Sequence, residues 1–200
     1  MGEGIIQDVE RYGVIMFVSF SVGNTGPFKE ITGITTLAEN LNKEFLEENT
    51  FEVSGQNYNK ISYIYGANGS GKTNYLAALT KMQKMIIMST VLGANNNKLL
   101  EVPAIKKELA APIETFKFDI DCKSKETYFE IQVIIEEILY TYSFAIQDGK
   151  IQKELLTKKK KRTEVLIKRT SPKYEDIVLR SGLSSFKNMV SVCLLYTSDA

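Results

Sequence analysis

The chain has 200 residues, of which 44% are hydrophobic and 24% charged, so it is long enough for one domain with a sizeable core and is ordinary in composition. Lysine and arginine number 25 against 24 for aspartate and glutamate, and the resulting net charge of +1 favours no class of partner. The absence of histidine excludes histidine-dependent mechanisms, and two cysteines without a CxxC pattern argue against a disulfide framework or a zinc site.

The first residues show neither a targeting signal nor a regular element. They are acidic where a signal peptide is basic, and no apolar run in the chain approaches the ~20 residues that a membrane helix needs. We therefore expect a cytoplasmic protein. Glycines interrupt residues 1–15, which predicts a non-core extension and makes Met16 a second candidate for the true start.

Short strands are predicted ahead of a glycine-rich loop. Residues 16–22 alternate apolar and polar side chains, as a strand with one buried face does. Residues 61–65 are β-branched and aromatic, which predicts a buried strand that ends at Gly66. Between them the sequence predicts a turn at 23–27, a strand-like stretch at 28–37, a loop with some helix at 38–49 and a short strand at 51–53.

Residues 66–73 match GxxxxGK[ST], the phosphate-binding P-loop. Glycines let such a loop fold tightly and point backbone N–H groups at an anion, and the N-terminus of the next helix adds a positive end. Residues 74 to about 88 have apolar side chains at helical spacing, so strand, loop and helix follow in the required order. A glycine-rich turn that matches by chance is the alternative.

The motif assigns a role to each residue of the loop. In the usual arrangement Lys72 reaches the β- and γ-phosphates as the catalytic cation, and the Thr73 hydroxyl binds Mg²⁺. The predicted phosphate-binding residues are Gly66, Ala67, Asn68, Gly69, Ser70, Gly71, Lys72 and Thr73.

After the helix, residues 92–100 contain a glycine and three consecutive asparagines, which predicts a break. Beyond Pro112 the pattern predicts an antiparallel meander whose clearest hairpin turn is Asp148-Gly149. Its expected strands are 116–120, 128–134, 139–146, 151–156 and 165–167, with a polar turn at 157–163.

Three stretches together carry a family resemblance. The P-loop has the form GxNGSGKTN, residues 20–30 read FSVGNTGPFKE, and residues 128–169 contain an aromatic-rich strand, a DG turn and a final LxKR-like strand in that order. Over residues 16–169 the chain resembles the N-terminal part of the ATPase head shared by the SMC, RecF and ABC-type group. In particular, it resembles the stand-alone bacterial AAA-family ATPases often found in defence systems.

The resemblance implies an α/β fold: a P-loop NTPase with an ABC/SMC-head-like N-terminal lobe and an inserted antiparallel β-subdomain at about 113–170. It implies ATP and Mg²⁺ as cofactors, Asn68 and Asn74 as further loop residues typical of the group, and a head-to-head homodimer. Many relatives have Arg or Lys in the opening turn where this chain has Gly26. Lys29 either takes that place or is a solvated surface lysine.

Two motifs of that group are not found. The nearest imitation of a Walker B segment, residues 133–137, has Glu136 where the metal-binding aspartate belongs, so Glu136 and Glu137 are predicted to form a turn. No LSGG-like signature is visible. Residues 193–200 resemble a translated sequencing adapter, which leaves 16–192 as an ATPase portion incomplete at its C-terminus; a genuine final strand is the alternative.

Five adjacent cations stand out near the end of the meander: Lys158, Lys159, Lys160, Lys161 and Arg162. On a hairpin tip they could contact the phosphates of a nucleic acid. They could equally be a solvated turn whose like charges discourage edge pairing.

The sequence therefore predicts ATP binding and, in the full-length protein, Mg²⁺-dependent hydrolysis by a head that switches a partner domain or a nucleic-acid contact. This segment alone is expected to bind nucleotide weakly and not to turn over. ATP rather than GTP follows from the resemblance only. A small-molecule kinase and a non-catalytic nucleic-acid-binding module remain the alternatives.

Overall fold

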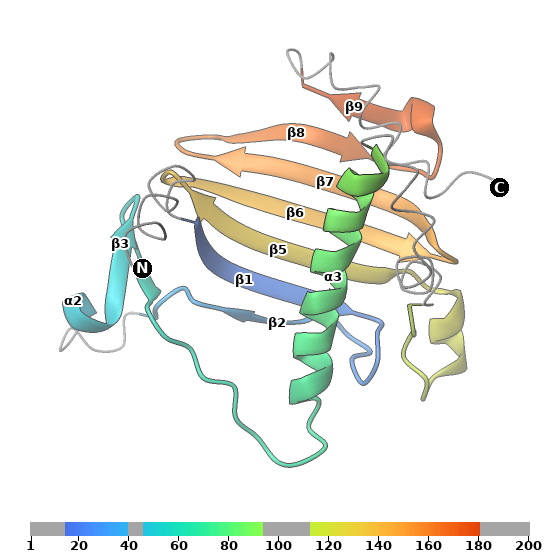
Figure 1. Cartoon of the computed structure of the whole chain (residues 1–200), viewed down its shortest axis with the longest axis horizontal. Helices are drawn as coiled ribbons and strands as arrows, with labels where there is room; N and C mark the ends of the chain where they lie inside the picture. The colour runs from blue at the N-terminus through green and yellow to red at the C-terminus, as the bar shows by residue number, and fades with distance from the viewer. Residues whose placement is uncertain (1–14, 40–45, 94–112, 181–200) are drawn as a thin grey trace, which may run out of the picture.

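The computed structural model of the chain describes residues 15–39, 46–93 and 113–180 (Figure 1). The expectations for residues 1–14, for most of the break at 92–100 and for 193–200 lie outside them. Within them the protein is a mixed α/β structure in which an antiparallel sheet dominates. None of the described helices is long and apolar enough to cross a membrane.

Seven strands form one antiparallel sheet in the order β2-β1-β5-β6-β7-β8-β9. Their bounds are Ile15–Gly23 (β1), Thr32–Thr35 (β2), Thr127–Ile135 (β5), Ile138–Gln147 (β6), Lys150–Lys159 (β7), Thr163–Arg169 (β8) and Ile177–Leu179 (β9). The predicted meander is confirmed from β5 to β8, and β5 pairs directly with the opening strand β1.

The remaining elements are short, apart from one long helix. A separate hairpin joins β3 (Thr50–Val53) to β4 (Gln56–Asn59), and the sequence pattern predicted only β3. The helices are α2 (Leu46–Asn49), α3 (Lys72–Gly93), and the 3-10 turns η1 (Ile120–Ser124) and η2 (Tyr174–Asp176).

Two-residue turns connect three of the hairpins. Both central residues have positive φ at Ser54-Gly55 (53° and 77°), Glu136-Glu137 (50° and 63°) and Asp148-Gly149 (51° and 73°). A turn with this backbone conformation matches the right-handed twist of the flanking strands. The predicted turn at Asp148-Gly149 is confirmed, and so is the assignment of the two glutamates to a turn.

Helix α3 runs across one face of the sheet (Figure 1). Its side chains Tyr75, Ala78 and Met82 are buried there at helical spacing. The strand residues that complete this core are Phe20, Val22, Phe129, Phe144 and Ile146.

A second, smaller core lies on the opposite face, where the β3–β4 hairpin packs. It consists of Val18, Tyr58 and Ile134, with Met16 and Leu139 against them. A bulge between Phe17 and Ser19 shifts the register of β1, so Val18 is buried on this face while Phe20 and Val22 face α3. The alternating pattern had predicted one buried face for β1, and the bulge gives it two.

The predicted strand at 61–65 is wrong. These residues form no strand, and Ile61, Tyr63 and Tyr65 are 66%, 82% and 92% exposed. In Figure 1 the segment between β4 and α3 runs outside the sheet, past its β2 edge. Strand propensity describes a fit to a paired, half-buried surface, and no described strand offers that surface to this segment.

The predicted strand at 116–120 is also wrong, and the stretch at 28–37 yields only β2. The Phe116 amide donates to the side chain of Asn24 rather than to a neighbouring strand. The Phe116 and Phe118 rings contact each other edge to face, with 5.7 Å between centroids, and Phe118 is exposed. The alternation of aromatic residues here therefore reflects contact between two neighbouring rings and not the hydrogen-bonded pairing of a β-strand.

Candidate functional site

The glycine-rich loop lies between the extended segment and the first turn of α3, which begins at Lys72. Gly69 and Gly71 have φ of +82° and +95°, conformations that side-chain-bearing residues rarely adopt. The Ser70 amide donates to the Ala67 carbonyl at 3.2 Å, and the Tyr75 amide donates to Gly71 at 2.9 Å to start the helix. The loop is thus a tight turn that leads straight into a helix N-terminus.

Lys72 closes this loop on itself. Its Nζ donates to the carbonyl oxygens of Gly66 at 2.7 Å and Ala67 at 2.8 Å, and it lies 3.5 Å from Ser70 Oγ. A Cβ on Gly66 would meet that Ser70 oxygen at 3.0 Å, so the first glycine permits a close approach within the loop. Residues 66–70 are exposed, which leaves the amine and the loop accessible from solution.

Thr73 and Asn74 follow on the first turn of α3, and both are exposed. The first four amides of a helix have no partner within it, so an anion bound here gains hydrogen bonds as well as a favourable dipole. Among the described residues, no three acidic or cysteine side chains come together as a metal site. The assignment of Thr73 as a metal ligand rests on the loop motif alone.

The opening turn packs against the loop. A Cβ on Gly71 would lie 3.2 Å from Pro27 Cγ and 3.3 Å from Phe28 Cζ. A Cβ on Gly26 would lie 4.0 Å from Asn74 Cβ. Two of the three stretches that carry the family resemblance are therefore neighbours in space, and a side chain at Gly71 would crowd their contact.

Tyr75 anchors the start of α3 to the sheet. Its buried hydroxyl donates to the Phe20 carbonyl on β1 and accepts from the Ile34 amide on β2 at 3.0 Å. Its ring meets Phe20 and Phe28 edge to face, with centroids 5.3 and 6.0 Å apart. Burial raises the pKa of the Tyr75 hydroxyl, so it stays protonated and able to donate.

Asn24 fixes the opening turn to the segment before β5. Its side-chain nitrogen donates to the Cys122 carbonyl at 2.9 Å and the Lys125 carbonyl at 3.0 Å, and its oxygen accepts from the Phe116 amide at 3.2 Å. Its own carbonyl accepts from the Thr127 hydroxyl at 2.9 Å. This buried network sets the position of the turn that lies against the glycine-rich loop.

Neither interpretation of Lys29 is confirmed, because its amine pairs with Asp119 at 2.8 Å. The hydrogen bond to Asp119 raises the pKa of Lys29, and the same bond lowers the pKa of Asp119. Because Lys29 is exposed and Asp119 is only partly buried, this pair is a surface tether between the turn and residues 113–119.

The basic run is far from the loop in space. Lys158 and Lys159 end β7, and residues 160–162 form the connection to β8. In Figure 1 this connection lies at the left end of the sheet, whereas α3 starts beyond the β2 edge. Lys158 pairs with Glu164 at 3.5 Å. The predicted hairpin tip is confirmed, and it does not contribute to the glycine-rich loop.

The sequence did not reveal the residues that hold the glycine-rich loop and the opening turn in place. Tyr75 counted only as an apolar helix residue, and Asn24 only as part of a turn. The glycine spacing near the loop was visible in the sequence, whereas the partners of Asn24 lie about a hundred residues away. No protein-family model matches the chain, and neither a curated protein nor a solved structure was found to be similar to it.

Proposed function

We propose that this chain is the nucleotide-binding part of an ABC/SMC-type ATPase head that holds the phosphates of Mg²⁺-ATP at residues 66–74. The observation that carries the proposal is Lys72, whose amine lies across a GxxxxGKT loop at the start of a 22-residue helix. A cation held only by neutral carbonyls gains stronger, charge-assisted bonds when phosphate oxygens replace them.

The residues around the loop suit a triphosphate. Lys72, the loop amides and the first turn of α3 would hold the β- and γ-phosphates, and the Thr73 hydroxyl would be a ligand of Mg²⁺. Bound Mg²⁺ would neutralise charge on the phosphates. The opening turn, held by Asn24, supports the loop from behind through Pro27 and Phe28.

Hydrolysis in this proposal belongs to the full-length protein, acting as a head-to-head homodimer that switches a partner domain. For the 200-residue chain we propose nucleotide binding without turnover. Phosphate release by residues 16–192 that depends on Lys72 would contradict this part of the proposal.

The experiment is thermal unfolding of the chain with increasing Mg²⁺-ATP, with GTP and EDTA in parallel. A ligand that binds only the folded state stabilises it by about 2.7 kcal/mol at a hundred times its Kd, so the midpoint should rise with concentration. Lys72→Ala should remove the rise. An equal rise in Lys72→Ala would contradict binding at this loop.

Alanine substitutions at Gly69 and Gly71 test whether the opening turn contributes to nucleotide binding. Alanine at Gly69 or at Gly71 is strained because both have positive φ, but only at Gly71 would the new Cβ meet Pro27 and Phe28, whereas at Gly69 it meets open space. Gly71→Ala should therefore weaken the ATP-induced rise more than Gly69→Ala does. The reverse order would show that the opening turn has no part in shaping the loop.

A further inference from the structure

Three hairpin turns meet at the end of the sheet that lies away from the glycine-rich loop: Ser54-Gly55, Glu136-Glu137 and residues 160–162 (Figure 1). Together they border a cavity of about 140 Å³. Its lining side chains include Val53, Tyr58, Ile134, Leu139, Lys159 and Lys160.

This cavity is open to solvent, and its lining combines apolar, polar and cationic side chains. Val53, Ile134 and Leu139 belong to the smaller core beneath the β3–β4 hairpin, and Lys159 and Lys160 approach from the basic tip. A volume of roughly 150 Å³ accommodates a benzene-sized molecule, so this cavity has room for a single planar ring. Glu137 also lines it and offers a hydrogen-bond acceptor to an N–H group of a base.

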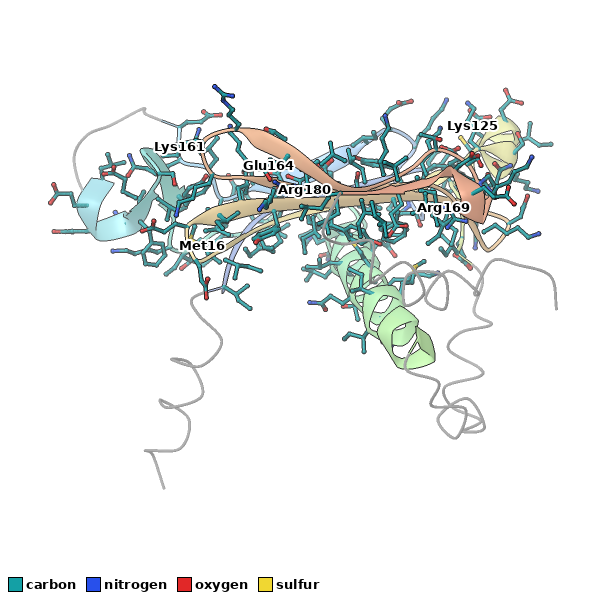
Figure 2. All side chains as sticks on the ribbon, turned by 90° about the horizontal axis from the view of Figure 1, so that it is seen from above. Met16, Lys125, Lys161, Glu164, Arg169 and Arg180 are labelled. Carbon is teal, nitrogen blue, oxygen red and sulfur yellow. The ribbon has the colours of Figure 1, made fainter. Side chains whose placement is uncertain are left out.

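The basic tip beside the cavity is not neutralised. Glu164 already contacts Lys158 at 3.5 Å and also Arg180. In the described part of the chain no ion pair involves residues 159–162, which are all exposed. Figure 2 shows Lys161 at this end of the sheet, while Arg169 and Lys125 lie toward the other end.

We infer that this end of the sheet binds single-stranded nucleic acid, with phosphates on Lys159, Lys160, Lys161 and Arg162 and one base in the cavity. Cationic surfaces that follow the backbone, combined with places for exposed bases, are the usual means of binding single strands. A duplex is excluded from the cavity because its bases are stacked and paired. The site does not depend on the glycine-rich loop or on the function proposed for it.

The first test is fluorescence anisotropy of the 200-residue chain with a short labelled oligothymidylate over a range of salt concentrations. Four phosphate contacts to a single strand predict a slope of log K against log salt of about −3. Replacing Lys159, Lys160, Lys161 and Arg162 by glutamine should weaken binding at low salt by about tenfold or more and flatten this slope.

A matched control removes four exposed cations elsewhere: Lys117, Lys123, Lys125 and Lys173, each to glutamine. The control variant should keep both the affinity and the salt slope. An equal loss in the two variants would overturn the proposal, because it would show that binding follows net charge rather than the tip.

The second test addresses the cavity. The wild-type chain should bind the oligonucleotide about fivefold or more tightly than an abasic strand of the same length and charge. Leu139→Phe, which places a ring at the cavity, should remove this preference and keep the salt slope. Equal affinity of the wild-type chain for both strands would overturn the base site without any need for a variant.

Further outcomes would overturn the proposal altogether. These are absence of binding at low salt, tighter binding to a duplex than to a single strand, and binding to phosphatidylserine vesicles instead of the oligonucleotide. Lys72→Ala should leave oligonucleotide binding unchanged while it removes the ATP-induced thermal shift. A failure of either proposal is therefore distinguishable from a failure of the other.

Discussion

Tyr142, Glu154 and Arg169 form a polar cluster on the α3 side of the sheet. The Tyr142 hydroxyl donates to Glu154 Oε1 at 2.7 Å, and Glu154 faces Arg169 across β7 and β8. Arg169 is 2% exposed and donates to the carbonyl oxygens of Ser171 and Pro172. Glu154 Oε2 and Arg169 Nη1 have no hydrogen-bond partner, so the burial of the two charges is only partly compensated.

This cluster predicts a pH dependence of stability. Burial raises the pKa of Glu154 above its ordinary value of 4.5, although the Tyr142 hydrogen bond and the charge of Arg169 oppose the shift. The folded state therefore holds the Glu154 proton more tightly than the unfolded state does. Its contribution is fully present below pH 4.5 and is lost as the pH rises through the raised pKa.

Urea unfolding of the wild-type chain and of Glu154→Gln at a series of pH values checks this. The free energy of unfolding of the wild type should fall relative to that of the variant as the pH rises above 4.5. Glu52→Gln, at an exposed position of β3, controls for the loss of one carboxylate. A constant difference between wild type and Glu154→Gln at all pH values would contradict a raised pKa.

At the scale of elements, α3 and the opening turn both link the glycine-rich loop to the main core, since Phe28 of that turn also packs against the core. The fully buried residues of the contact face of α3 are Tyr75, Ala78 and Met82, and partly buried side chains of the helix pack beside them: Leu79, Met85 and Ile86. Apolar side chains also occupy its exposed side, where Leu76 is 53% and Ile87 59% exposed. The apolar spacing of the sequence therefore predicted the helix but not which of its faces packs, because that depends on the sheet residues it meets.

We expect Met82→Ala to destabilise the fold by about 2–5 kcal/mol, because it leaves a cavity among Phe20, Phe129 and their neighbours. Leu76→Ala, on the same helix, should cost about 1 kcal/mol or less, because that side chain is half exposed. Urea unfolding of the two variants gives both values. Similar losses for the two would show that α3 packs with a different face.

Over the whole molecule, the sequence predicted the structure that neighbouring residues determine and missed the contacts between residues far apart in the chain. The turn at Asp148-Gly149 and the strands β5 to β8 follow from turn residues and alternation, which act over a few positions. The bulge in β1 and the bonds of Asn24 depend on residues about a hundred positions away in the chain. The GxxxxGKT spacing located the candidate loop, but not the opening turn that packs against it or the anchoring role of Tyr75.

The largest disagreement between the sequence prediction and the structure concerns residues 61–65, and unfolding measurements test it directly. The sequence predicts a buried strand, whereas Tyr63 and Tyr65 are 82% and 92% exposed in the structure. Replacing both by serine should therefore change the free energy of unfolding by only about 0.5 kcal/mol. Tyr58→Ser is the reference for a buried tyrosine: it is 3% exposed, and its loss should cost about 3–5 kcal/mol.

Urea unfolding of the three proteins decides between two arrangements of the chain. A small change for the double variant and a large one for Tyr58→Ser would show that the loop is held by α3 and the opening turn alone. A loss for the double variant as large as that for Tyr58→Ser would mean that the segment is buried against a strand. In that case the glycine-rich loop would be supported from both sides, which is the arrangement that strand, loop and helix in sequence predict.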